Sequence, residues 1–276
     1  MIEVVPRWAL WLFWFALGGC IGSFLNVCIY RLPREESLVR PGSRCPRCRH
    51  PIAWHDNIPL VSFALLRGAC RHCGKPIHWR YPVVELLTAG LTVAVLERFG
   101  AGPAGLAYLA FVSALIAVSF IDLEFQIIPD EISLGGLAVG VALSGLVPIL
   151  HGTESRWLSL GRSAIGILVG GGVLYGTSVV GDFIFRKESM GGGDIKLMAM
   201  AGSLLGWKTA LLAFFLAPLL ALIPGLAVLA FKRSHVIPYG PFLSLALVVS
   251  LFFGGEILRA TGIEDTVRFL REYYGW

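Results

Sequence analysis

Charge is scarce in this chain. Asp, Glu, Lys and Arg make up 15% of its 276 residues, against roughly a quarter in an ordinary soluble domain. Hydrophobic residues make up 56%, and the mean hydropathy is +0.73. So little charge argues against a soluble protein and indicates a polytopic membrane protein. The net charge of +5 does not favour nucleic-acid binding, because a basic balance in a membrane protein usually records which loops stay in the cytosol.

A cleavable secretory leader is also not evident in the sequence. The first long uncharged run, Trp8 to Tyr30, has neither the basic segment nor the small-residue cleavage site of a signal peptide. We therefore expect this run to be a permanent first transmembrane helix.

Long apolar runs, by contrast, are abundant, and about twenty apolar residues in a helix span a bilayer. Eight candidate segments are found, of which the second, Val83–Leu96, and the sixth, Ile195–Trp207, are short. The sixth would be either a tilted short helix or a re-entrant segment. The predicted fold is therefore an all-α polytopic membrane protein with seven or eight transmembrane helices and a small cytosolic zinc-ribbon-like insertion after the first. The candidates are Trp8–Tyr30, Val83–Leu96, Ala104–Ile121, Ile132–Leu150, Ser163–Val180, Ile195–Trp207, Thr209–Phe231 and Tyr239–Phe253.

Lysine and arginine predict the orientation. They are concentrated in residues 31–80 more than in any other connection, and such a concentration marks a cytosolic loop. Alternating through eight helices then places Asp122 and Asp194 at the cytosolic face. The predicted divisions are a first helix at 1–30, a zinc-binding loop domain at 31–80, a helix bundle carrying the aspartates at 81–258 and a tail at 259–276.

Two cysteine pairs lie within this loop, at Cys45-Pro-Arg-Cys48 and Cys70-Arg-His-Cys73. Their spacing fits a tetrahedral zinc ribbon, with the four cysteines as ligands. Two disulfides are the alternative, which a reducing cytosol disfavours. His50 and His72 are spare candidates, more often surface histidines. A structural zinc ion would supply folding energy that so short a loop lacks.

The surface of this loop leaves two readings open. Its basic residues could meet anionic lipid headgroups, or they could help seat a substrate segment. Cys20 and Cys28 lie outside the loop, in the first helix, and are expected to pack as small apolar residues.

A run of glycines precedes one of two notable aspartates. Gly191, Gly192 and Gly193 lead into Asp194, so a flexible turn would deliver a carboxylate to the start of an apolar helix. Asp122 directly follows the uncharged run that ends at Ile121. Each has an ordinary alternative, since Asp194 could cap its helix and Asp122 could be a helix-end charge at the interface. An ionisable group at the end of a membrane segment is nevertheless a candidate functional residue.

A further acid, Glu124, follows Asp122 by two residues. It is expected to lie in a loop, where a solvated carboxylate needs no special role.

Six features in order resemble one known family. They are Gly22 to Pro33, the two cysteine pairs, Arg80 to Glu85, Asp122 to Asp130, Gly191 to Lys196, and Pro238 to Pro241. Together they look like the type IV prepilin leader peptidases, membrane aspartic proteases of the glycine-x-glycine-aspartate class. The resemblance covers nearly the whole chain, and no matching aspartate or cysteine is missing.

The resemblance implies that Asp122 and Asp194 are the catalytic pair, with Gly191, Gly193 and Lys196 as turn or substrate residues. It implies an enzyme of the bacterial inner membrane that removes the basic leader from type IV prepilins or pseudopilins at the cytosolic face. Many such enzymes also methylate the new N-terminus with S-adenosylmethionine. Paired carboxyls suit the chemistry, because one keeps a proton while the other takes one from water.

A site for S-adenosylmethionine is not evident in the sequence, which lacks a recognisable glycine-rich nucleotide-binding motif. Glu85, an acid in an apolar setting, is a candidate contributor, although such a residue more often pairs with a basic neighbour, here Arg80.

Two other classes of function remain open from the residues. A proton- or cation-coupled transporter with a metal-binding cytosolic loop would place its acids near the bilayer midplane. A scaffold that recruits partners through the zinc loop would tolerate replacement of both aspartates.

Overall fold

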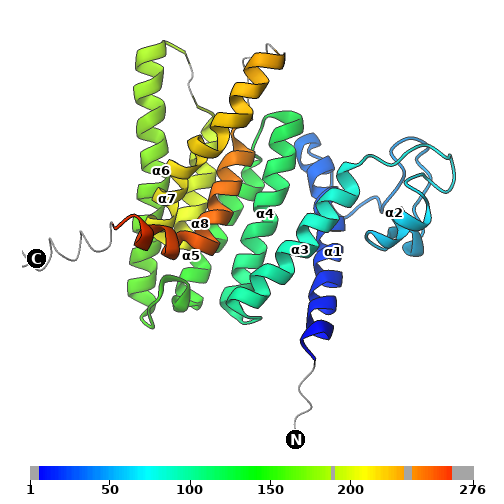
Figure 1. Cartoon of the computed structure of the whole chain (residues 1–276), viewed down its shortest axis with the longest axis horizontal. Helices are drawn as coiled ribbons and strands as arrows, with labels where there is room; N and C mark the ends of the chain where they lie inside the picture. Colours follow the sequence, from blue (N-terminus) through cyan, green and yellow to red (C-terminus); the bar gives the residue numbers. More distant parts are fainter. Residues whose placement is uncertain (1–5, 188–189, 233–237, 263–276) are drawn as a thin grey trace, which may run out of the picture. The chain divides into compact units, whose positions relative to one another are not determined.

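The computed structural model describes residues 6–187, 190–232 and 238–262, and within these the regular structure is helical (Figure 1). Residues 263–276 of the predicted tail lie outside the described residues. The chain divides after Pro129 into two compact units. The all-α prediction is confirmed.

The first unit contains α1 (Arg7–Arg31), α3 (Arg80–Phe99) and α4 (Pro103–Phe125), which pack against one another. A loop between α1 and α3 holds the short helix α2 (Val61–Leu65) and two 3-10 turns, η1 (Leu32–Arg34) and η2 (Trp54–Asn57).

Glycines let α1 approach α3 closely. A Cβ on Gly18 would lie 2.7 Å from the Cα of Ala89, and one on Gly22 would lie 2.7 Å from the Cα of Glu85. Larger residues at these positions would push the helices apart. Small residues at a helix crossing are typical of helices packed in membranes.

The second unit contains α5 (Asp130–Leu146), α6 (Arg156–Phe185), α7 (Gly192–Lys232) and α8 (Gly240–Ala260), with the 3-10 turn η3 (Pro148–His151) between α5 and α6. Helices α6 and α7 cross in close contact. A side chain on Gly166 would overlap the carbonyl of Gly202, and a side chain on Gly202 would overlap the carbonyl of Gly166. Glycine at both positions therefore sets how near the two helices come.

Helix α7 joins the sixth and seventh predicted segments, and it breaks at Gly206, where φ is 77°. The break frees the carbonyl of Ser203 from its place in the helical ladder. Three groups on other elements bind this oxygen instead: the hydroxyl of Ser163 at 2.9 Å, that of Ser144 at 3.1 Å and Nε2 of His151 at 3.1 Å. This cluster of polar groups holds the helix break in place.

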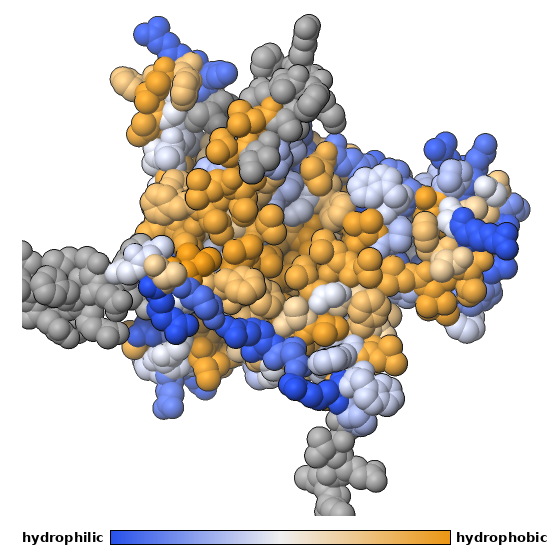
Figure 2. Space-filling model, in the orientation of Figure 1, coloured by the Kyte–Doolittle hydropathy of each residue, from blue (hydrophilic) through white to orange (hydrophobic). Residues whose placement is uncertain are grey.

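Five helices within the described residues are long and apolar enough to cross a membrane: α1 with η1, α4, α6, α7 as far as Leu226, and α8. Helices α3 and α5 are not among them, so the predicted total of seven or eight spans stays a prediction. Apolar surface extends over much of the helical region in Figure 2.

Candidate active site and metal centre

Asp122 lies in the last turn of α4. The residue is buried, with 7% of its surface exposed. The helix ends at Phe125, and the next residue, Gln126, has a left-handed backbone (φ 57°) whose N–H bonds to the Asp122 carbonyl at 2.9 Å. This C-cap ends α4 directly beyond the carboxyl, so the aspartate stands at the end of an apolar helix, as the sequence indicated.

An ion pair lies two residues beyond Asp122. The guanidinium of Arg80 donates to Glu124, and the Arg80 side chain is almost fully buried. Two expectations were therefore wrong: Glu124 lies in α4 rather than in a loop, and Arg80 pairs with Glu124 rather than with Glu85. Glu85 instead accepts a hydrogen bond from the backbone N–H of Leu60 at 2.8 Å. The ion pair between Arg80 and Glu124 joins the start of α3 to the end of α4.

Asp194 lies in the first turn of α7, which begins at Gly192. The expected three-residue glycine turn is thus wrong in extent, because Gly192 and Gly193 are helical and only Gly191 precedes the helix. An acid in the first turn is favourable, since unpaired backbone N–H groups and the helix dipole stabilise negative charge there. A Cβ on Gly192 would meet nothing within 4 Å, so the backbone beside Asp194 is open.

Tyr239, just before α8, responds to the charge on Asp194. Burial raises the pKa of Tyr239, and the Asp194 carboxylate raises it further, to about 12. The phenol therefore stays protonated at neutral pH and can donate a hydrogen bond. Tyr239 belongs to the Pro238 to Pro241 motif, from which no role for it could be predicted.

Lys196 follows Asp194 by two residues and binds Asp130, the first residue of α5. Its Nζ donates to Oδ1 at 2.7 Å and to Oδ2 at 3.0 Å. The start of α7 is thus tied to the start of α5.

The four loop cysteines come together as predicted. The Sγ atoms of Cys45, Cys48, Cys70 and Cys73 all lie within 4.8 Å of one another, with 4.0 Å between those of Cys45 and Cys73. A tetrahedral Zn²⁺ with bonds of about 2.3 Å needs sulfurs about 3.8 Å apart. The donor set and its spacing therefore fit zinc after a small contraction.

The two cysteine pairs occupy matching backbone hairpins, 25 positions apart in the sequence. The N–H of Cys45 bonds to the carbonyl of His50, and the N–H of Cys70 bonds to that of Lys75. The bridges Arg44 to Pro51 and Ala69 to Pro76 repeat in the same way. The sequence signal for the matching hairpins is the repeated pattern Cys-x-x-Cys-x-x-Pro-Ile, in which the same Pro-Ile pair follows each pair of cysteines.

The thiols influence one another. Hydrogen bonds from the backbones of Cys73 and His72 lower the pKa of Cys70 to about 7. A hydrogen bond from the His50 backbone favours the thiolate of Cys48, but burial and the neighbouring Cys45 and Cys73 raise its pKa to about 11. Thiols this close do not all ionise unless a cation is bound. His50 and His72 pack edge to face, with ring centroids 4.0 Å apart.

Family models match segments in both units of the chain. Residues 16–99 match the Bacterial Peptidase A24 N-terminal domain, and residues 109–226 match the Type IV leader peptidase family. A protein of Aeromonas hydrophila named prepilin leader peptidase/N-methyltransferase is 37% identical over 279 residues, which cover 90% of this chain and 93% of that protein. The chain belongs to the type IV leader peptidase family.

Two other relatives of this leader peptidase carry the same name. The protein of Pseudomonas aeruginosa is 34% identical over 269 residues, covering 88% of this chain and 90% of its own length. That of Myxococcus xanthus is 42% identical over 217 residues, which cover 79% of this chain but only 62% of the relative. No solved structure matches the chain.

Proposed function

We propose that this leader peptidase is an aspartic endopeptidase of the bacterial inner membrane that removes the leader of type IV prepilins or pseudopilins and then N-methylates the new N-terminus. Family membership supports prepilin processing, and the relatives' names support both activities. The structural observation that carries the proposal is the placement of Asp122 at the end of α4 and Asp194 at the start of α7.

The connectivity supports a common membrane surface for these two acids. Only residues 126–129 separate the end of α4 from the start of α5, so a chain that crosses the membrane in both helices would bring these two ends to the same surface. Lys196 ties the start of α7 to Asp130 at the start of α5. The excess of lysine and arginine in residues 31–80 favours the cytosol as the location of this surface.

The chemistry needs no covalent intermediate. When two carboxyls approach each other, one remains protonated because both cannot ionise easily. The ionised member takes a proton from water, and its neighbour donates to the scissile carbonyl and then protonates the leaving amine. The two aspartates titrate as one unit, so the base and the acid are not assigned individually. The phenol of Tyr239 would supply a donor beside Asp194.

Gly191 and Gly193 would serve substrate approach. A scissile peptide bond inside a helix is hydrogen-bonded and shielded, so the substrate must be extended at the cut. The open space at Gly192, between these two glycines, leaves room for an extended chain to lie close to the carboxyl. Lys196 would act indirectly, by holding the start of α7 through Asp130.

The cysteines would hold a structural zinc ion. Cys45, Cys48, Cys70 and Cys73 would bind it as thiolates, and the ion would supply folding energy to the loop.

S-adenosylmethionine would be the methyl donor. The described residues contain no β-strand, so they offer no strand–turn–helix site of the dinucleotide-binding type for it. Glu85, the candidate contributor, uses one carboxylate oxygen to hold Leu60. We therefore assign no residue to methyl transfer.

The test is cleavage of a purified prepilin by the protein in liposomes, with and without S-adenosylmethionine, followed by product mass. Asp122→Asn and Asp194→Asn should each abolish cleavage. Glu131→Gln is the matched control, because Glu131 is an exposed acid in the first turn of α5. Cleavage by either aspartate variant at the original rate would remove that residue from the mechanism. A transporter or scaffold would leave the prepilin intact with every variant, and no observation favours either.

A further inference from the structure

The loop between α1 and α3 contains an apolar segment, Ile58 to Leu66, which carries no charged residue. This segment, which we call the wedge, includes α2. Charged residues flank it, with Asp56 before it and Arg67 after it.

The wedge contacts the middle of α1 rather than its end. A Cβ on Gly19 would lie 3.3 Å from the Cβ of Pro59. Gly19 is midway between Arg7 and Arg31, the ends of α1, and at about 1.5 Å per residue it lies roughly 18 Å from each. Half of a hydrocarbon core is about 15 Å thick. Because α1 is long and apolar enough to cross a membrane, this contact places Pro59 beside the middle of a candidate membrane span.

A second contact holds the wedge at this depth. The N–H of Leu60 donates to Oε2 of Glu85 at 2.8 Å, and the Cα of Glu85 lies against Gly22 of α1. Glu85 is itself buried. The wedge is therefore attached to both α1 and α3 within the span of α1.

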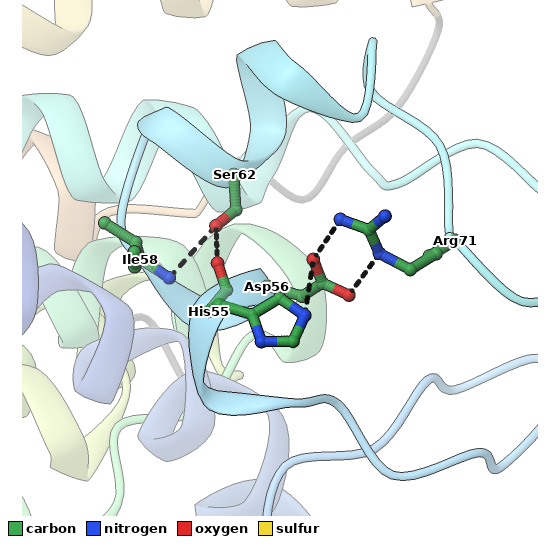
Figure 3. A network of polar contacts seen from close by, with 5 residues as sticks. All are labelled: His55, Asp56, Ile58, Ser62 and Arg71. Carbon is green, nitrogen blue, oxygen red and sulfur yellow. Dashed lines mark hydrogen bonds and ion pairs between the residues drawn. The ribbon is translucent and has the colours of Figure 1, made fainter.

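The backbone of the wedge is suited to an environment without water. Ser62 accepts a hydrogen bond from the N–H of Ile58 at 3.1 Å and donates to the carbonyl of His55 at 2.8 Å (Figure 3). Internal hydrogen bonds also satisfy further N–H groups, namely those of Val61, Ser62, Ala64 and Leu66. Backbone polar groups must be satisfied internally within a bilayer.

Three large apolar side chains of the wedge are nevertheless exposed. Leu65 is 77% exposed and Val61 is 51% exposed, and Ile58 is also exposed. Figure 2 shows apolar as well as polar surface on the loop. At the outer edge, Arg71 donates to both carboxylate oxygens of Asp56, at 2.7 and 2.8 Å, which neutralises that acid beside the apolar segment (Figure 3).

We propose that the wedge, residues 58–66, is embedded in the leaflet that contains the Arg31 end of α1, with Val61 and Leu65 against lipid acyl chains. The metal-binding hairpins stay outside the hydrocarbon, and the wedge fixes them to the membrane surface. This inference concerns lipid contact alone, so it does not depend on the proposed cleavage reaction.

Thiol labelling tests the proposal in the zinc-loaded full-length protein in nanodiscs, where a charged, membrane-impermeant maleimide reaches both faces. Leu65→Cys is compared with Val39→Cys, since Val39 is an equally exposed apolar residue (82%) of the same loop outside the wedge. Peptide mass measurement separates these thiols from the native cysteines. The thiol introduced at position 65 should react at least about tenfold more slowly than that at position 39, because hydrocarbon excludes charged reagents. Equal rates at the two positions would overturn the proposal.

A photocrosslink identifies the neighbour directly. A benzophenone amino acid at position 65 should form adducts with the mass of a phospholipid after irradiation. The same amino acid at position 39 should form none or few. Adducts of position 65 with a prepilin or with a second copy of the chain, in place of lipid, would show that the wedge is a protein-binding surface and would also overturn the proposal.

Discussion

Lys196 binds Asp130 with two hydrogen bonds, 2.7 and 3.0 Å long, only two residues from the carboxyl of Asp194. Both side chains are partly exposed, at 39% and 56%. Loss of such an exposed pair should cost less than about 1 kcal/mol of stability. Because the Lys196–Asp130 pair lies next to Asp194, its loss should affect the placement of the Asp194 carboxyl more than it affects folding.

We therefore predict that Lys196→Ala lowers prepilin cleavage while the thermal midpoint changes by only a few degrees. Asp130→Asn should lower cleavage to a similar extent, and the double variant should be no worse than either single variant, because the two residues act as a unit. Cleavage rates and thermal unfolding of all three proteins check this. Losses that multiply in the double variant would show that the residues act separately.

We expect the Tyr239 phenol to donate a hydrogen bond to the Asp194 carboxylate during catalysis. A hydrogen bond to a charged group contributes about 1.5–3 kcal/mol, so Tyr239→Phe should lower cleavage about tenfold or more. Loss of a donor beside the Asp194 carboxylate disfavours the ionised form. The acid limb of the pH–rate profile should therefore move to higher pH. Tyr175→Phe is the control, because Tyr175 is an exposed tyrosine of α6. An unchanged acid limb for Tyr239→Phe would separate this phenol from the titrating pair.

Cys48→Ser should lower the bound zinc well below one ion per chain and should make the loop sensitive to protease, because three thiolates hold zinc less tightly than four. Cys20→Ser, which changes an exposed cysteine of α1, should retain the metal. Elemental analysis and limited proteolysis measure both effects. Full zinc occupancy in the Cys48 variant would argue that another residue completes the site.

Gly192→Val should fold normally, because a Cβ there meets nothing and the backbone is helical. It should nevertheless reduce cleavage, since the added side chain occupies the open backbone beside Asp194. Gly176→Val in α6 provides the control, as a Cβ there also meets nothing. Comparable cleavage by the two variants would mean that substrate does not approach along this backbone.

His151 should make stability depend on pH. Burial lowers the pKa of His151, the hydrogen bond with Ser203 raises it in part, and the charge of Arg162 lowers it again. The unfolded chain therefore binds a proton near pH 6.5 that the folded protein does not, so stability is greatest above that pH and falls as the pH drops below it. His151→Asn should flatten this dependence between pH 5 and about 7.5 in thermal unfolding experiments.

The apolar runs and the cysteine spacing were enough to predict part of the fold. The uncharged run before Asp122 became α4, and the two Cys-x-x-Cys pairs converged. The pairing of Arg80 with Glu124 could not be predicted, because partners 44 residues apart depend on how helices pack. The start of α7 at Gly192 could not be predicted either. Glycine is a poor helix former, so its sequence preference indicates a turn, whereas Gly192 and Gly193 are helical in the structure.

Other contacts depend on a backbone carbonyl or N–H group, which leaves no side-chain pattern to read. The bond from Leu60 to Glu85 and the three donors around Ser203 are of this kind. The predicted segments Ile195–Trp207 and Thr209–Phe231 do place an interruption near Gly206, but the sequence does not indicate what would bind the freed oxygen. The likeness of the two hairpins, by contrast, could have been read from the repeated Pro-Ile after each cysteine pair.

The paired hairpins have a consequence for the stretch between them. A metal bound by all four thiols would crosslink Cys45 to Cys70 and close a ring of 25 positions around residues 53–67. Closing a ring removes disorder from the open chain, so the crosslink would restrict residues it never touches. A chelator would therefore loosen not only the ligands but also the enclosed residues that rest on α1.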